Sequence, residues 1–444
     1  MATAPEHWGI VGGGFLGLAL AQKLAAAGHR VTVLEAAPQL GGLASAWQLG
    51  GVTWDKHYHV ILLSDFNVHA LLKAIGLDSE FVGVETKTGF YTDGKLYSMS
   101  NSLEFLRFPP LGLLAKFRLG LTILRASKIQ DWKALEKVTV VDWLTKHSGE
   151  STFRKIWLPL LRAKLGDSYK VASAAFIWAI IARMYAARRS GLKKEMFGYV
   201  RGGYSRIIGR FANALQDRGV ELRLANPVDR VDVIAGQVHV EVRHGESLQF
   251  DKVVVTAAAP LASKLVPGLT DREHARLNAI TYQGIVCASI LLKKPLDRFY
   301  VTNITDDWVP FTAVIEMSAL VDRSEFDGQS LVYLPKYVAP NDPLFEETDQ
   351  AIRERFLGAL AKMYPHFEPD DVLAFRVSRV RNVFAVSTLN YSAMVPPFAT
   401  SLPGVYLVNS SQIVNGTLNI NETLALAEQA LPALLMEPEL SSVS

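Results

Sequence analysis

Three glycines and one acid near the start of the chain have the spacing of a dinucleotide-binding site. Gly12, Gly14 and Gly17 fill a G-x-G-x-x-G pattern directly after an apolar run at residues 7–11. At these positions a tight turn, a pyrophosphate and a close helix each exclude a side chain. Glu35 follows roughly 20 residues later, where a carboxylate can accept hydrogen bonds from a ribose and repels a 2′-phosphate. The pattern therefore predicts dinucleotide binding and disfavours NADP.

The same stretch predicts the elements that position this site. A strand at residues 7–11 precedes a helix whose apolar residues recur at helical spacing, and a second strand at residues 31–35 ends in the acid. Gly28 suits the left-handed end of that helix. Phe15 and Leu16 open the helix, so they should lie where its N-terminus faces the phosphates.

The alternative for this stretch is a signal peptide or a membrane span, because residues 8–27 are almost wholly apolar. Gln22 and Lys23 interrupt the run, and no cationic region precedes it. The glycines near its start would also weaken a helix beginning there. The dinucleotide interpretation is therefore favoured.

A second glycine pair follows the acid, in the segment Ala36 to Ala44, and Trp54-Asp55-Lys56-His57-Tyr58-His59 comes soon after. These segments resemble the flavoprotein superfamily of amine oxidases, protoporphyrinogen oxidases and carotenoid (phytoene) desaturases, with some likeness to UDP-galactopyranose mutases. The resemblance implies FAD, with its pyrophosphate against backbone N–H groups. The residues that it assigns to the cofactor here are Ala36, Gly41, Gly42, Leu43 and Ala44. Many members carry an Arg at the place of Leu43, so this chain must rely more on backbone groups and the helix dipole.

The resemblance also implies the fold class. We expect an α/β protein with a Rossmann-like FAD-binding domain of the glutathione-reductase type, interleaved with a mixed α+β substrate domain. The FAD-binding domain would comprise residues 1–88, 199–284 and 385–437. The substrate domain would comprise residues 89–198, mostly helical, and 285–384, rich in strands. Within the second part, strands are predicted at residues 312–317, 330–337 and 372–386, and a helix at 349–364.

A glycine pair in the middle of the chain, Gly202-Gly203, precedes a helix and a strand that contains Val228. The resemblance implies that the backbone of Val228 meets the adenine. The buried strand at residues 251–257 ends in Thr256 and Ala257, small residues that would let the backbone approach the dinucleotide. An ordinary strand followed by a turn would give the same pattern.

A third segment lies near the C-terminus, where a strand ends in Asn409-Ser410 and a helix follows Asn419 and Asn421. The resemblance implies that this segment closes over the flavin and that the helix N-terminus faces the N1 and C2 carbonyl edge. Asn421 has the chemistry of an N-cap. Amine oxidases usually have an acid after the strand, so here Asn409 and Ser410 would give neutral hydrogen bonds to the ribityl phosphate. An ordinary capped terminal helix is the alternative.

The chemistry of such a protein belongs mostly to its cofactor, because the N5 atom of the flavin takes the hydride. The resemblance places His57, Tyr58 and His59 beside the isoalloxazine, and we expect His59 to contact N5 or O4. A solvated or buried structural His is the alternative. Lys336 and Arg381 are cations on predicted strands and are more typical of exposed strand charges. The sequence shows no His, Cys and carboxylate cluster with metal-ligand spacing, so no metal is expected.

The composition of the chain limits the other functional classes and the cellular location that we consider. The 444 residues are 49% hydrophobic and carry a formal net charge of +3, which gives no indication of nucleic-acid binding. The single cysteine, Cys287, excludes an intramolecular disulfide, so a cytoplasmic location is expected. Cys287 lies in a strand-like run far from the flavin motif near the C-terminus. We therefore expect a buried thiol and non-covalent FAD, while a homodimer stays open.

Two helical stretches combine apolar residues with cations. Residues 103–127 are rich in Leu and Phe, with Arg107, Lys116, Arg118 and Arg125 interspersed. Residues 151–194 carry ten Lys or Arg and one acid. This combination predicts peripheral docking on the cytoplasmic face of a membrane. The alternative is a buried helical bundle whose Arg residues lie on its outside.

These expectations combine into an FAD-dependent oxidoreductase that takes a hydride from C–C or C–N bonds of a lipophilic or ring-bearing small molecule. Two alternatives stay open. One is a redox-neutral reaction resembling that of UDP-galactopyranose mutase. The other is a non-catalytic flavin-binding partner protein, which the departures at Leu43 and Asn409 permit.

Overall fold

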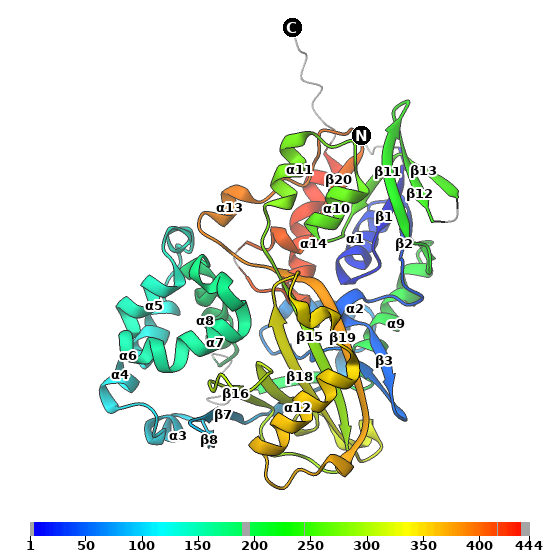
Figure 1. The fold of residues 1–444 in the computed structure, drawn as a ribbon. Helices are drawn as coiled ribbons and strands as arrows, with labels where there is room; N and C mark the ends of the chain where they lie inside the picture. Colours follow the sequence, from blue (N-terminus) through cyan, green and yellow to red (C-terminus); the bar gives the residue numbers. More distant parts are fainter. Residues whose placement is uncertain (1–3, 189–195, 244, 415, 437–444) are drawn as a thin grey trace.

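The computed structural model describes residues 4–188, 196–243, 245–414 and 416–436. A five-stranded parallel sheet gathers segments from both ends and the middle of the chain, in the order β10-β2-β1-β14-β20 (Figure 1). Its strands are β1 (His7–Val11), β2 (Arg30–Leu34), β10 (Glu221–Arg223), β14 (Lys252–Val255) and β20 (Val405–Leu407). The strand pattern at residues 7–35 is thereby confirmed.

Alternation along these strands decides what packs on each face of the sheet. Ile10, Val33 and Val254 belong to a core formed with the helices on one face, whereas Val253 and Val255 belong to a core formed with a small antiparallel sheet on the other. The helices are α1 (Phe15–Ala26), α9 (Gly203–Gln216) and α14 (Ile420–Leu435). The small sheet consists of β11 (Val228–Ile234), β12 (Gln237–Val242) and β13 (Glu246–Phe250).

A second, larger sheet has seven strands in the order β19-β15-β18-β17-β16-β7-β8. Its strands are β7 (Thr88–Thr92), β8 (Lys95–Ser98), β15 (Tyr282–Leu292), β16 (Val301–Ile304), β17 (Ala313–Glu316), β18 (Ser330–Val338) and β19 (Val372–Ala385). Helix α12 (Asp349–Met363) covers one face, next to Val286 and Ile290. The opposite face carries Cys287, which is buried as expected; burial raises the pKa of its thiol.

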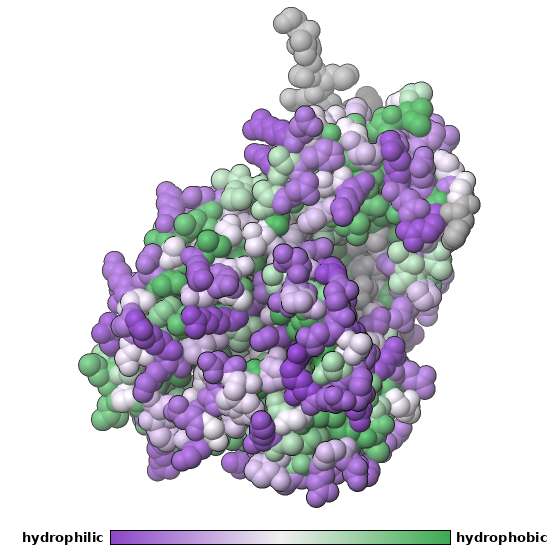
Figure 2. All heavy atoms as spheres, in the orientation of Figure 1, coloured by the Kyte–Doolittle hydropathy of each residue, from purple (hydrophilic) through white to green (hydrophobic). Residues whose placement is uncertain are grey.

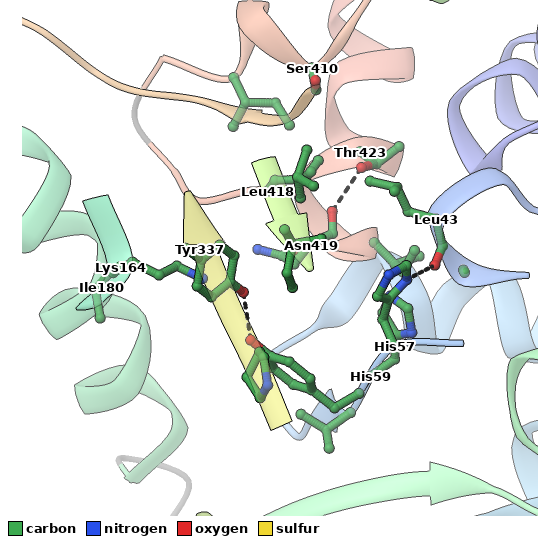
Figure 3. Close-up of a pocket in the computed structure, with 18 of the residues that line it drawn as sticks. Leu43, His57, His59, Lys164, Ile180, Tyr337, Ser410, Leu418, Asn419 and Thr423 are labelled. Atoms are coloured by element: carbon green, nitrogen blue, oxygen red, sulfur yellow. Dashed lines mark hydrogen bonds between the residues drawn. The ribbon is translucent and has the colours of Figure 1, made fainter. Parts of the chain in front are cut away.

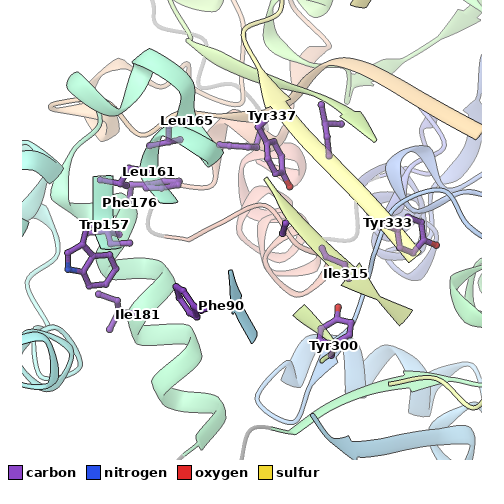
Figure 4. Packing of buried hydrophobic residues seen from close by; sticks show 14 of the residues in the cluster. Phe90, Trp157, Leu161, Leu165, Phe176, Ile181, Tyr300, Ile315, Tyr333 and Tyr337 are labelled. Atoms are coloured by element: carbon purple, nitrogen blue, oxygen red, sulfur yellow. The ribbon is translucent and has the colours of Figure 1, made fainter. Parts of the chain in front are cut away.

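A group of helices packs beside the face of this sheet that carries Cys287 (Figure 1). Aromatic and aliphatic side chains of the helices and of the sheet form one continuous core there, with Trp157, Phe176 and Ile181 opposite Tyr300 and Tyr337 (Figure 4). The helices are α3 (Ser102–Arg107), α4 (Leu113–Ala126), α5 (Val140–Ser148), α6 (Glu150–Thr152), α7 (Leu158–Leu165) and α8 (Ala174–Arg188).

Other α-helices and strands complete the described chain. They are α2 (Phe66–Ala74), α10 (Ala259–Leu265), α11 (Asp271–Asn278), α13 (Tyr391–Met394), β3 (Ala46–Leu49), β4 (Val52–Asp55), β5 (Ile61–Leu62), β6 (Phe81–Glu85) and β9 (Met196–Val200). Among the described helices, none has the length and apolar character needed to cross a membrane. Three cations of the predicted basic stretch, Arg189, Lys193 and Lys194, lie outside the described residues.

Candidate functional site

A cavity of about 980 Å³ lies where the predicted dinucleotide segments meet the seven-stranded sheet and the helices. Sixteen of the residues predicted from the sequence line this single cavity. They are Gly12, Gly14, Phe15, Leu16, Glu35, Gly41, Gly42, Leu43, Ala44, His57, Tyr58, His59, Thr256, Ala257, Ser410 and Asn419. Figure 3 shows part of it, with Leu43, His57 and His59 on one side and Tyr337 and Lys164 on the other. The separated sequence motifs therefore do converge.

Two glycines form an open cradle at the start of α1. A Cβ atom added to Gly14 would have the Cα atom of Gly42, 4.0 Å away, as its nearest neighbour, and a Cβ atom on Gly42 would lie 3.4 Å from the Cα of Gly14. The Gly41 N–H donates to the carbonyl of Gly13 at 2.8 Å, which holds the two turns together. The first turn of α1 carries no acid, so no side chain of the helix itself offsets the positive end that faces the cradle. This arrangement fits a pyrophosphate.

The other two motif glycines serve packing. A Cβ atom on Gly17 would lie 1.9 Å from the carbonyl oxygen of Gly12, and one on Gly12 would lie 2.4 Å from Oγ1 of Thr256. Gly17 therefore does not line the cavity but lets α1 approach β1 closely. Gly12 has a φ of +113°, a conformation that favours glycine.

Glu35 lies at the end of β2 and lines the cavity. Its Oε2 atom accepts from the Gly13 N–H at 2.7 Å, and its Oε1 atom accepts from the Ala37 N–H at 2.8 Å. The carboxylate is thereby held beside the cradle, where its negative charge disfavours a 2′-phosphate. Ala36 is exposed and does not line the cavity.

His57 connects two parts of the site through both ring nitrogens. Its Nδ1 lies 3.1 Å from the carbonyl oxygen of Leu43 and must donate, so its Nε2 accepts from the Ser378 hydroxyl at 3.0 Å. Burial lowers the pKa of His57 and keeps the ring neutral. His57 therefore fixes the turn at Leu43 against β19 and has no ring nitrogen left for another ligand.

His59 differs from His57 because its Nδ1 atom is buried and has no hydrogen-bond partner among the described residues. Its ring packs edge-on against Tyr204 at 5.2 Å between centroids. Burial, with a smaller contribution from His57, lowers the pKa of His59 to about 3, so the ring is neutral at physiological pH. The His59 side chain lines the cavity, so its neutral ring is available to a bound molecule, while its buried Nδ1 stays without a partner among the described residues.

The C-terminal segment corrects one prediction from the sequence. Helix α14 begins at Ile420, so the N-cap is Asn419, whose Oδ1 accepts from the Glu422 N–H at 3.0 Å. Asn421 lies inside the first turn, does not line the cavity, and instead accepts from the Asn67 N–H at 2.9 Å. The prediction that Asn421 caps the helix is therefore wrong. Figure 3 shows Asn419 directed toward the cavity.

Asn409 also lies outside the cavity. Its Oδ1 accepts from the N–H and the hydroxyl of Ser411, at 3.1 and 2.7 Å, while its buried Nδ2 has no partner among the described residues. Ser410, the next residue, does line the cavity. Contact with a ribityl phosphate stays a prediction for both.

Some of the remaining predicted residues line the cavity and others do not. Thr256 lines the cavity, and its hydroxyl donates to the Val11 carbonyl at 2.9 Å. Val228 begins β11 opposite Val242 and lies outside the cavity lining, so its contact with adenine stays a prediction. Neither Lys336 nor Arg381 lines the cavity: alternation along β18 turns Lys336 away from the face that presents Tyr337, and Arg381 pairs with Glu346.

Sequence reasoning missed the part of the cavity that faces away from the glycines. Most of its lining is apolar and comes from α4, α8 and the seven-stranded sheet. It includes Met99, Ile123, Trp157, Ile177, Ile180, Ile181, Met184, Phe197, Ile285, Ile315 and Val383. Among these walls, the hydroxyls of Tyr58 and Tyr337 lie 2.5 Å apart, and Lys164 lies beside Tyr337. The helical pattern of α8 indicates a buried helix, but no pattern shows that it faces a cavity.

The class of protein follows from the way the fold builds this cavity. A glycine cradle at the N-terminus of α1, with an acid after the next strand, faces the same cavity as the Asn419-capped N-terminus of α14. This arrangement is typical of an FAD-binding oxidoreductase. The chain belongs to the family of flavin-containing amine oxidoreductases, whose family model matches residues 17–419. The residues of the cradle fit the diphosphate, and the ring of His59 lines the same cavity.

Individual relatives are distant. The chain is 22% identical to a zeta-carotene desaturase of Synechocystis sp., over 90% of this chain and 91% of that protein. It is 24% identical to a hydroxysqualene dehydroxylase of Zymomonas mobilis, over 68% of this chain and 72% of that protein. Among solved structures, an oxidoreductase from Methanosarcina mazei superposes with a TM-score of 0.73 at 16% identity, covering 96% of this chain and all of that one. The last comparison shows the shared fold.

Proposed function

We propose that the protein oxidises a C–C or C–N single bond of a lipophilic or ring-bearing small molecule to a double bond. A hydride leaves from a C–H bond of one atom, and a proton leaves from the neighbouring atom to solvent. The observation that carries this proposal is the continuity of one cavity, from the glycine cradle to a chamber with mostly apolar walls. A chamber of this kind favours an apolar molecule, because apolar surface gains free energy on leaving water. The names of the relatives support the same class, since zeta-carotene and hydroxysqualene are both largely hydrocarbon.

FAD, when bound, supplies the hydride acceptor. The residues of the chain bind the cofactor and the substrate and orient them. The N-terminus of α14, capped by Asn419, would present a partial positive charge to the bound FAD. His59 offers a neutral nitrogen for one hydrogen bond, and its low pKa means that it brings no positive charge at pH 7. The apolar walls exclude water, which protects the reduced ring from side reactions.

The experiment that tests this function is an anaerobic titration of the purified protein, followed by its visible absorption. Pools of lipid, amine, porphyrin and sugar nucleotide are added separately. We expect the lipid pool or the porphyrin pool to bleach the flavin band. Turnover of a sugar nucleotide without net bleaching would instead indicate a redox-neutral mutase-like reaction. No spectral change with any pool or reductant would indicate a non-catalytic flavin-binding protein.

We further propose that the outer face of α3 and α4 docks on an anionic membrane surface. Seven large apolar side chains there are exposed by 42% or more, namely Leu103, Leu106, Leu113, Leu114, Phe117, Leu121 and Leu124. In Figure 2 apolar atoms lie along the edge of the molecule at the position of α4. Exposed Arg107, Arg118 and Arg125 flank them, and none of the three forms an ion pair with a described residue. Apolar area with unpaired cations suits anionic headgroups.

The position of α4 between the cavity and the protein surface also supports the docking proposal. Ile123, on its inner side, lines the cavity, while Phe117 and Leu121 point outward. The second basic stretch behaves differently, because Trp157, Leu161 and Ile177 are buried in the core. For that stretch, the alternative of a buried helical bundle describes the packing.

Vesicle flotation tests the docking. We expect the protein to float with vesicles that contain phosphatidylglycerol and to float less with pure phosphatidylcholine. Replacing Leu114, Phe117 and Leu121 by Ser should reduce the bound fraction at least tenfold, because three exposed apolar anchors are lost. Ile234→Ser is the control, since Ile234 is 55% exposed but lies on β11. Equal flotation of the triple variant and the control would contradict the docking proposal.

A further inference from the structure

Three charged residues line the cavity, and two of them have partners. Glu35 accepts from the backbone at Gly13 and Ala37. Arg183 donates to both carboxylate oxygens of the buried Asp65, at 3.1 and 3.0 Å. The third, Lys164, forms no ion pair with any residue that the structure describes. The nearby acid Asp167 already pairs with Lys170 at 2.8 Å.

Lys164 is held in place by aromatic rings. Its Nζ atom lies 3.6 Å from the centroid of the Tyr337 ring and 5.1 Å from that of Phe384. The Tyr337 hydroxyl is bonded to that of Tyr58 at 2.5 Å, so the ring that supports the cation is fixed from its other end. Figure 3 shows Lys164 reaching from α7 toward Tyr337, across the cavity from His57 and His59.

The surroundings leave the positive charge without an anion. The small pocket that Lys164 shares with Ile180, Val383 and Leu418 also contains the neutral hydroxyl residues Ser387, Ser410 and Thr417, but no Asp or Glu among the described residues lines it. Ring faces attract an ammonium group but do not replace a counter-ion. A cation in such walls therefore favours a ligand that brings a negative charge together with apolar surface.

We propose that Lys164 binds the carboxylate of a substrate that is otherwise apolar. This inference rests on the proposed function and narrows it, from lipophilic molecules in general to amphiphiles with an anionic end. The lysine fixes which end of the molecule lies at Tyr337 and therefore which carbon atoms lie across the cavity. Lys164 is thus a residue that determines specificity and orientation.

The test compares two ligands of the holoenzyme that differ only in their head group, dodecanoate and 1-dodecanol, below their aggregation concentrations. Binding is measured by isothermal titration calorimetry. We expect wild type to prefer dodecanoate by about 10- to 100-fold, the range of a hydrogen bond to a charged group. Lys164→Met should bring the two affinities to within about threefold, because its side chain keeps apolar length and loses the charge. Lys164→Arg should keep most of the preference.

Lys155→Met is the matched control, since Lys155 is exposed and lies outside the cavity lining, and it should behave as wild type. Equal affinities in wild type, a preference that survives in Lys164→Met, or no binding of dodecanoate would overturn the inference. The flavin midpoint potential is measured in the same variants and should not change. A lower potential in Lys164→Met would mean that the lysine acts on the cofactor, which would also overturn it.

These outcomes are separate from those of the proposed function. If wild type binds dodecanoate and 1-dodecanol equally, the inference about Lys164 is wrong, but the protein can still oxidise a neutral lipid. Failure of every pool to bleach the flavin would refute the proposed oxidation even if dodecanoate binds through Lys164.

Discussion

Replacing Gly14 by Val should remove FAD while leaving the fold in place. Gly14 has a φ of −74° and a ψ of 176°, which valine adopts without strain. Its Cβ would meet only the Cα of Gly42, at 4.0 Å, so the new methyl groups would enter the open cradle rather than the core. The perturbation therefore falls on the space that we assign to the diphosphate.

The magnitude follows from the contacts that valine would block. If two backbone N–H groups at the start of α1 lose their hydrogen bonds to a charged phosphate, binding loses about 3–6 kcal/mol, at roughly 1.5–3 kcal/mol each. The Kd for FAD should then rise by about 10²- to 10⁴-fold. The change of an N-cap glycine to valine should itself cost only about 1 kcal/mol of stability.

Gly112→Val is the matched control. Gly112 is the N-cap of α4, with a φ of −68° and a ψ of 162°, and a Cβ atom there would meet nothing within 4 Å. Both variants carry the same change at a helix start, but one lies in the cradle. The assay is titration of each apoprotein with FAD, followed by flavin fluorescence, with circular dichroism to check folding. A folded Gly14→Val protein that binds FAD as tightly as Gly112→Val would refute the placement of the phosphates.

Two further predictions concern stability of the apoprotein. Asn419→Ala should lower the free energy of unfolding in urea by about 1 kcal/mol through loss of the α14 cap, and Asn421→Ala should lower it by less; the reverse order would contradict the assignment of the cap. Burial raises the pKa of Glu316 to about 7 from 4.5, so its contribution to stability is complete below pH 4.5 and is lost as pH rises through 7. Between pH 5.5 and 8 wild type should therefore lose about 2 kcal/mol more than Glu316→Gln, and parallel pH profiles of the two proteins would contradict this.

The dinucleotide half of the site could be predicted because its determinants are local. Gly12, Gly14 and Glu35 lie on consecutive elements, and each position is limited by backbone geometry that the sequence pattern expresses directly. The error at Asn421 has a local cause too. Asn419 and Asn421 both have cap chemistry, and only the start of the helix at Ile420 decides between them.

The substrate half could not be predicted because its contacts span long separations. Tyr58 meets Tyr337 across 279 positions, and the sheet that presents Tyr337 combines β7 with strands some 200 residues later. Lys164 looks like any other helical cation until the fold surrounds it with apolar walls. For α4 the sequence leaves docking and burial both open, because the helix carries apolar residues on its inner and outer sides, and only the fold shows that Phe117 and Leu121 are exposed.

The most direct test of the account is the flavin content of the purified wild-type protein. After acid precipitation, chromatography of the supernatant should give one FAD per chain, with no flavin left in the pellet. A colourless protein that does not take up added FAD, flavin retained in the precipitate, or a different nucleotide in the supernatant would contradict the account.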